Sequence, residues 1–99
     1  MAAFTPQTIS LDLSEYSEVE ITFKHIYNTD GPYASAKGRK NEITMCMVPT
    51  YSNRSLPRRD FKATDTGVTF GYGSGFDDQF NWYGQNNNWA IPIRIWGIQ

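Results

Sequence analysis

Residues 18–25 read Glu-Val-Glu-Ile-Thr-Phe-Lys-His and alternate between polar and apolar side chains. Val19, Ile21 and Phe23 share one parity, and the residues between them are charged or carry a hydroxyl group. A period of two places alternate side chains on opposite faces of an extended chain, so this segment predicts a β-strand with one buried face. His25 has the parity of the apolar residues, and we expect it to end the buried face in a structural role.

Similar alternation recurs along the chain in short segments that turn residues separate, and no window shows a helical stripe of useful length. About seven short strands joined by turns predict an all-β fold, either an antiparallel β-sandwich or a small barrel. We take the antiparallel, jelly-roll-like β-sandwich as the expected fold. The predicted strands cover residues 8–13, 18–25, 42–48, 60–63, 68–72, 80–83 and 89–98.

Two segments lack this alternation and are expected to be loops. Residues 27–41 are rich in Asn, Asp, Gly and Pro, which favour turns. Residues 50–60 are polar and basic, and Pro57 is expected to break any strand there. A short strand is expected to follow only at residues 60–63.

Gly71, Gly73 and Gly75 occupy alternate positions in one predicted strand region. Their spacing does not match a dinucleotide-binding loop, because the third glycine has the wrong offset and no helical pattern follows. Glycine at alternate positions instead removes the side chains from one face of a strand. We therefore expect another backbone segment or a ligand to approach this face closely.

The chain has 99 residues, which is the size of one domain, and we treat 1–99 as a single β-sandwich domain. Its hydrophobic content of 39% and its net charge of −1 exclude an intrinsically disordered protein. A single cysteine excludes a disulfide scaffold, and the lack of an apolar run of about 18–20 residues predicts no membrane insertion. The N-terminus has no basic segment followed by an apolar stretch, so we expect folding in a reducing cytoplasm.

Charge is unevenly distributed, and residues 34–63 hold seven bases and only two acids. Arg54, Arg58 and Arg59 within this block could form a surface patch that faces an anion such as phosphate, sialic acid or lipopolysaccharide. The same block could equally be a solvated loop region, and both interpretations stay open. The sequence pI near 5.7 argues against nucleic acid as a partner.

An active site cannot be assembled from this sequence. His25 is the single histidine, and Cys46 lies in the apolar run Ile-Thr-Met-Cys-Met-Val, where cysteine behaves as a small buried hydrophobe. Asp77 and Asp78 could form half of a two-carboxylate hydrolase site or, with the amides at 86–88, a calcium site. Adjacent carboxylates of this kind are more often turn residues, so we expect a non-enzymatic protein with no metal and no cofactor.

Aromatic and amide side chains are interleaved in the turn-rich segment from residue 70 to residue 89, and aromatic residues make up 15% of the chain. A flat ring can stack on the apolar face of a sugar, while Asn, Asp and Arg side chains bind its hydroxyl groups. The alternative is that alternate residues belong to the core and that the amides form a polar hairpin tip. The candidate glycan-binding residues are Tyr72, Phe76, Asp78, Trp82, Tyr83, Asn86, Asn87 and Trp89.

The two ends of the chain resemble one protein family. Residues 9–21 contain Ser-Glu-Tyr-Ser-Glu between two alternating segments, which resembles the opening of the small C-terminal receptor-binding domains of bacteriophage tail fibre and tail-tip proteins. Residues 88–98 contain Ile-Pro-x-x-Ile-x-Gly-Ile, which is similar to the closing segment of these domains, with Trp96 as the aromatic residue before the glycine. Residues 27–80 show no such likeness.

The resemblance implies a β-rich, trimeric tip of a phage tail that recognises a bacterial cell-surface polysaccharide during host adsorption. It also implies a location in the virion after synthesis in the host cytoplasm. The last predicted strand agrees with a trimer, because Trp96 and Ile98 lie opposite in parity to Trp89 and Ile91, so that one apolar face can contact another subunit. The alternative is a structural virion module, for decoration or assembly, in which aromatic side chains form the subunit interfaces.

Overall fold

The computed structural model describes residues 4–26, 30–49, 56–76 and 82–99, with the backbone alone for Phe76, Trp82 and Tyr83. These residues form eight β-strands and no helix. This part of the chain thus contains no helix long and apolar enough to cross a membrane. The strands are β1 (Gln7–Ser10), β2 (Glu18–Ile26), β3 (Tyr33–Arg39), β4 (Ile43–Met47), β5 (Leu56–Thr64), β6 (Gly67–Phe76), β7 (Trp82–Gln85) and β8 (Trp89–Ile98).

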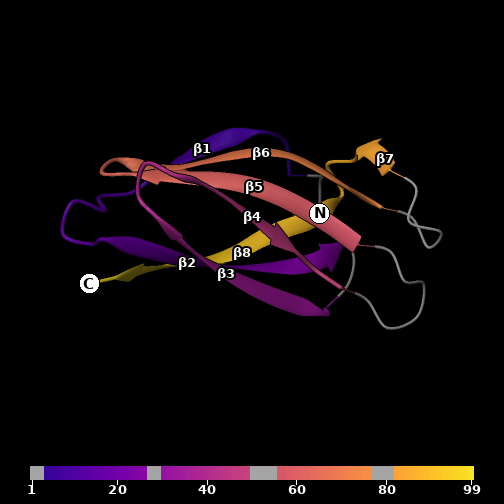
Figure 1. Ribbon diagram of the computed structural model, residues 1–99, viewed down its shortest axis with the longest axis horizontal. Helices are drawn as coiled ribbons and strands as arrows, with labels where there is room; N and C mark the ends of the chain where they lie inside the picture. Colours follow the sequence, from indigo (N-terminus) through magenta and orange to yellow (C-terminus); the bar gives the residue numbers. More distant parts are fainter. Residues whose placement is uncertain (1–3, 27–29, 50–55, 77–81) are drawn as a thin grey trace.

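The strands form two antiparallel sheets that pack face to face, as Figure 1 shows. The five-stranded sheet has the order β1-β6-β5-β4, and β7 also pairs with β6. The three-stranded sheet has the order β3-β2-β8. The expected antiparallel β-sandwich is therefore confirmed, with eight described strands instead of about seven.

The core lies between the sheets, and the alternating segment of β2 supplies its centre. Val19, Ile21 and Phe23 are completely buried, as their shared parity predicts. The centroid of the Phe23 ring lies 6.0 Å from that of Phe61 in β5 and 6.2 Å from that of Phe70 in β6. These contacts join the two sheets. They also stabilise the fold, because complete burial of one such ring is worth about 1.5–3 kcal/mol.

His25 and Cys46 are buried, as the sequence predicts. His25 ends the inner face of β2, and its backbone N–H donates to the carbonyl of Pro32 at 3.0 Å. Burial lowers the pKa of the His25 imidazole. Burial also raises the pKa of the Cys46 thiol to about 11, so this group is protonated and a poor nucleophile at neutral pH.

The loop predicted for residues 27–41 is wrong, because β3 occupies Tyr33–Arg39 and pairs with β2 along its whole length. The inward positions of β3 hold two alanines and Gly38, which are too small to give a hydrophobic alternation in the sequence. Small residues are required there. A Cβ atom at Gly38 would collide with the Thr44 side chain of β4 and would lie 2.9 Å from the Phe61 ring.

The loop predicted for residues 50–60 is wrong over its described part, because β5 begins at Leu56 and includes Pro57. Pro57 lacks an N–H group, but its carbonyl accepts a hydrogen bond from the Val48 N–H at 2.8 Å. The inner face of β5 also holds Arg59. A charged residue on a buried face hides the alternation on which the sequence prediction depends.

We predict that protonation of His25 destabilises the fold. Because its pKa is lowered in the folded state, a proton binds more readily to the unfolded chain, and the free energy of unfolding falls as the pH drops below the ordinary value of 6.5. Denaturant titrations on either side of this pH measure the loss. A His25→Gln variant cannot titrate and should lose less stability over the same interval, so equal losses would contradict the prediction.

Candidate functional site

The outer face of the five-stranded sheet carries two adjoining depressions over β5 and β6. The smaller has a volume of about 180 Å³ and the larger a volume of about 470 Å³. Both are lined by Asp60 and Gly71, so they adjoin at these two residues, and we call the pair of depressions the β5–β6 trough. Its other lining residues are Arg58, Tyr72 and Ser74 at one end and Ile43, Phe61, Lys62, Thr64, Thr69 and Phe70 at the other.

The alternation of β5 places the polar residues of the trough. Arg58, Asp60 and Lys62 reach the outer face, whereas Arg59 and Phe61 are buried between them. Successive side chains of a strand point to opposite faces, so every second residue of this strand lines the trough.

A β-bulge shapes the floor of the trough. The register of β5 against β6 shifts between Arg59 and Phe61. Within this shift Asp60 alone faces two residues of β6, Gly71 and Tyr72. The Tyr72 side chain is left 47% exposed on the outer face, and Gly71 beside it adds no side chain. The bulge therefore presents one aromatic ring beside bare backbone.

An ion pair lies beside this ring. The Arg58 Nη2 atom donates to Asp60 Oδ1 at 2.7 Å, and both side chains are partly exposed. Each of the two restricts the other, so a guanidinium and a carboxylate are held in place at the wall of the trough. Together with the phenol group of Tyr72 they offer hydrogen-bond donors and acceptors to a ligand.

Arg59 is fully buried and supports this arrangement from inside. The Phe4 ring covers its guanidinium, with 5.2 Å between Cζ and the ring centroid. Burial lowers the pKa of Arg59 to about 10, which leaves the group charged at neutral pH. Its nitrogen atoms donate to four backbone carbonyls, those of Gly71 at 2.7 Å, Ala90 at 2.8 Å, Trp89 at 2.9 Å and Asn87 at 3.3 Å.

The structure does not bring Arg58 and Arg59 of the candidate anion patch, which also includes Arg54, to one surface. Arg58 and Arg59 are adjacent in a strand and lie on opposite faces of the sheet, so only the first of them reaches the surface. Arg54 lies outside the described residues. Arg58 is thus the one member of the patch that the structure places in the trough, where it is paired with Asp60.

The candidate residues Asn86 and Asn87 belong to the turn between β7 and β8, and Trp89 begins β8 directly after it. The side-chain oxygen of Asn87 accepts from the Gly73 N–H at 3.1 Å, and that of Asn86 accepts from the Asn88 N–H at 3.1 Å. Gly73 admits this turn, because a Cβ atom there would lie 2.6 Å from the Trp89 carbonyl oxygen. Of the described residues that line the trough, none comes from this turn.

Tyr72 is the candidate glycan-binding residue that the structure places in the trough. Phe76 and Trp82 are paired across β6 and β7, and Tyr83 follows in β7, but the structure describes their backbone alone. Asp78, like the neighbouring Asp77 considered for hydrolysis, lies outside the described residues.

Sequence reasoning misses Asp60 and Lys62, which line the trough beside Arg58. A signal for them is present, because residues 58–62 read Arg-Arg-Asp-Phe-Lys, with charged residues at every second position. The second arginine obscures this alternation, since it makes the segment look like a basic loop.

An apolar groove of about 360 Å³ lies where β1 and β8 form the open edge of the sandwich. Its walls include Ile9 and Leu11 on the side of β1 and Ile95 of β8. Leu11 and Ile93 line the groove and are exposed. This edge therefore presents apolar surface to its surroundings.

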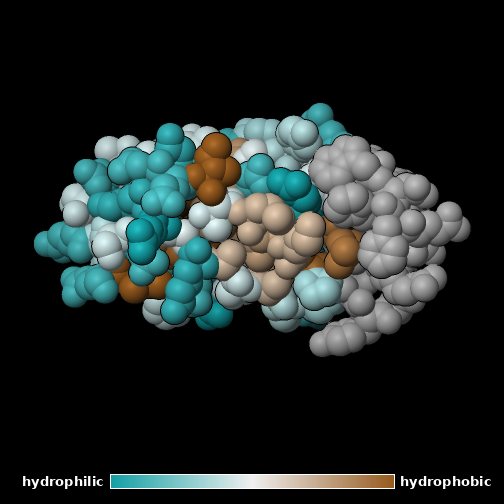
Figure 2. Space-filling view, in the orientation of Figure 1, coloured by the Kyte–Doolittle hydropathy of each residue, from teal (hydrophilic) through white to brown (hydrophobic). Residues whose placement is uncertain are grey.

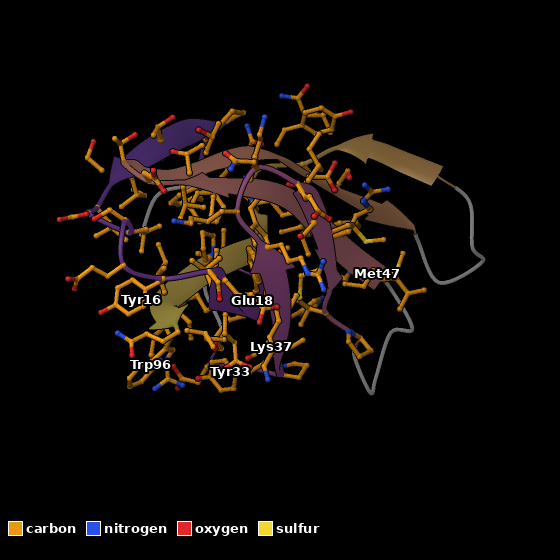
Figure 3. The ribbon with its side chains drawn as sticks, turned by 60° about the vertical axis from the view of Figure 1, so that its left-hand side comes forward. Tyr16, Glu18, Tyr33, Lys37, Met47 and Trp96 are labelled. Carbon is orange, nitrogen blue, oxygen red and sulfur yellow. The ribbon has the colours of Figure 1, made fainter. Side chains whose placement is uncertain are left out.

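Exposed aromatic side chains also occur on the outer side of the three-stranded sheet. Tyr33 of β3 and Trp96 of β8 project there, on the lower side of the ribbon in Figure 3. The Arg94 guanidinium lies 5.5 Å from the Trp96 ring. On the face that Figure 2 shows, hydrophilic side chains gather at the end of the molecule that carries the β5–β6 hairpin.

Replacing Arg59 with methionine should strongly destabilise the protein. Methionine keeps much of the aliphatic volume but removes every donor to the buried carbonyls, and each unsatisfied group costs about 1–3 kcal/mol. We expect the free energy of unfolding, measured by denaturant titration, to fall by at least ~3 kcal/mol. The control Arg58→Met, one residue away on the outer face, should cost less than ~1 kcal/mol. Similar losses in the two variants would show that Arg59 does not hold the bulge.

Comparisons with known proteins show no family for this chain. Family models, curated proteins and solved structures were compared with the chain, and none of them matches.

Proposed function

We propose that the protein is a receptor-binding tip domain of a bacteriophage tail, which binds a bacterial cell-surface polysaccharide in the β5–β6 trough. In this proposal the domain belongs to the virion, is made in the host cytoplasm and acts in host adsorption. The observation that carries the proposal is the exposed Tyr72 ring beside the ion pair of Arg58 and Asp60. A sugar stacks its apolar face on an aromatic ring and exchanges hydrogen bonds with neighbouring charged groups.

The chemistry of the trough favours binding over catalysis. Asp60 is the one carboxylate among its described lining residues, and it is engaged with Arg58 at 2.7 Å. Hydrolysis of a glycosidic bond ordinarily uses two carboxyl groups, one on each side of the bond that breaks. We therefore propose a protein that binds its polysaccharide without cleaving it.

The two segments that resemble phage tail tips lie against each other. The opening segment leads into β2 and the closing segment is β8, and these strands pair antiparallel with Glu18 opposite Ile98. The Tyr16 ring packs directly on Gly97, where a Cβ atom would lie 2.6 Å from the ring. The tyrosine of one motif and the glycine of the other thus form a single contact, which supports treating the two segments as one structural unit.

A Tyr72→Ala variant tests the proposed site. Loss of the stacking surface should weaken binding of purified host cell-wall polysaccharide at least tenfold, or by ~1.4 kcal/mol, in titration calorimetry. The control Tyr33→Ala removes a tyrosine of similar exposure, 54% against 47%, from the other sheet and should leave the affinity unchanged. An equal loss in both variants, or no binding of any host polysaccharide by the wild-type protein, would contradict the proposal.

We further propose that the protein is a homotrimer whose subunits meet along the edge formed by β1 and β8. Leu11 and Ile93 are exposed there, and the groove that they line is mainly apolar. β8 is the end strand of its sheet and pairs with β2 on one side only within the described part of the chain. Contact with another copy would cover both the apolar side chains and this open strand edge.

Light scattering tests the trimer. The wild-type protein should have about three times the 11.3 kDa mass of one chain. An Ile93→Asp variant should have a lower mass, because it places a charge in the apolar contact. The control Ile43→Asp changes an exposed isoleucine on the other sheet and should leave the mass unchanged. A wild-type mass of one chain at micromolar concentration would remove the trimer.

A structural virion module, for decoration or assembly, is the second candidate, and the exposed Ile43 and Tyr72 on the outer face of the five-stranded sheet favour it, because a neighbouring subunit would cover them. The two candidates differ in the environment of Tyr72. A structural module should bury this residue between subunits, whereas a receptor-binding tip leaves it open in the assembled oligomer. Hydroxyl-radical footprinting of the oligomer distinguishes the two by the labelling of Tyr72.

A further inference from the structure

We infer that the ligand of the β5–β6 trough is a linear acidic polysaccharide, which lies along β5 and places a carboxylate or phosphate group at Lys62. This inference rests on the proposed glycan-binding function and adds the class and the orientation of the ligand. Three properties of the trough carry it, namely its length, its balance of charge and the apolar surface of its walls.

The two depressions of the trough together follow β5. The outward residues of β5 from Arg58 to Thr64 line it, and a strand rises about 3.3 Å per residue, so the trough extends over ~20 Å. Gly71 adds no side chain where the depressions adjoin, and the nearest atoms to an added Cβ there would be those of Asp60 at 3.8 Å and 3.9 Å. This shape fits a chain of several sugar units better than a single terminal sugar.

Lys62 gives the trough a net positive charge. Arg58 and Asp60 neutralise each other in their ion pair. Lys62 is exposed, and its cross-strand neighbours are uncharged, with Ile43 in β4 and Thr69 in β6. Among the residues that the structure describes, no carboxylate forms an ion pair with Lys62. An acidic group on the ligand would supply the missing partner.

The walls around Lys62 suit a sugar better than a free anion. Ile43 is 74% exposed, and Thr64 and Thr69 bring methyl and hydroxyl groups to the same depression. Apolar surface beside hydroxyl groups matches a sugar ring, which has an apolar face and a polar rim. Tyr72 supplies a second apolar surface at the other end, so a polymer with an acidic group in its repeat contacts both ends at once.

Titration calorimetry with three probes tests this inference. The probes are an oligogalacturonate, a neutral oligogalactan of the same length and a glycerol phosphate polymer. We expect one of the acidic probes to bind at least tenfold more tightly than the neutral one, with a difference that shrinks as the salt concentration rises. The tighter of the two acidic probes identifies the acidic group as a carboxylate or a phosphate.

Three variants locate the interaction. Lys62→Gln should reduce the affinity for the acidic probe to that for the neutral probe. Lys37→Gln removes an exposed lysine from the outer face of the other sheet and should have no effect. Gly71→Ala adds a methyl group that the fold accommodates, and it should weaken binding of the long acidic probe more than binding of its disaccharide.

Two results would overturn the inference and leave glycan binding at Tyr72 intact. One is equal affinity for the acidic and neutral probes, and the other is an equal effect of Lys62→Gln and Lys37→Gln. A wild-type protein that binds none of the probes and no host polysaccharide would instead remove the proposed function itself.

Discussion

The buried guanidinium of Arg59 is the group on which the rest of this sandwich depends. It donates to the carbonyl of Gly71 in the five-stranded sheet and to that of Ala90 in the three-stranded sheet, so it joins the two layers. A buried cation is costly unless its donors are satisfied, and here backbone carbonyls satisfy them. Ala90, whose carbonyl is one of these acceptors, has a φ of 52°, in the left-handed region that non-glycine residues seldom adopt. The carbonyl of Gly71 turns inward at the bulge, which leaves Tyr72 on the outer face.

The sequence predicts the strands whose inner positions hold large apolar side chains. It does not predict the strands whose inner positions hold small or charged side chains. The strands β2 and β8 can be predicted from the sequence, because bulky apolar residues recur at alternate positions along them. The strand β3 escapes prediction because its inner face is made of alanine and Gly38. The strand β5 is not predicted for a different reason. Arg59 occupies an inner position, and its guanidinium donates hydrogen bonds to carbonyls that are distant in the sequence, such as that of Ala90.

The sequence predicts a residue of the candidate site correctly only where a side chain of a ligand-binding type is also exposed in the fold. Tyr72 and Arg58 were identified for separate reasons, as a stacking ring and as part of a basic patch, and the bulge brings them to one wall. Asp60 was missed, because its role depends on the register between β5 and β6. Asn86 and Asn87 were expected to bind sugar hydroxyls, but their side-chain oxygens accept from backbone N–H groups. Composition cannot distinguish an amide that faces a ligand from one that closes a turn.

The proposed ligand face and the proposed subunit edge lie on different parts of the sandwich. The trough is on the outer face of the five-stranded sheet, whereas Ile93 belongs to β8 in the other sheet. Subunits that meet along β8 would therefore leave Tyr72 open to solvent. A tip domain requires this separation, because a polysaccharide must reach the trough after the oligomer has formed. Several troughs on one oligomer would also engage a repetitive polysaccharide together, so that a modest affinity at each site yields strong attachment.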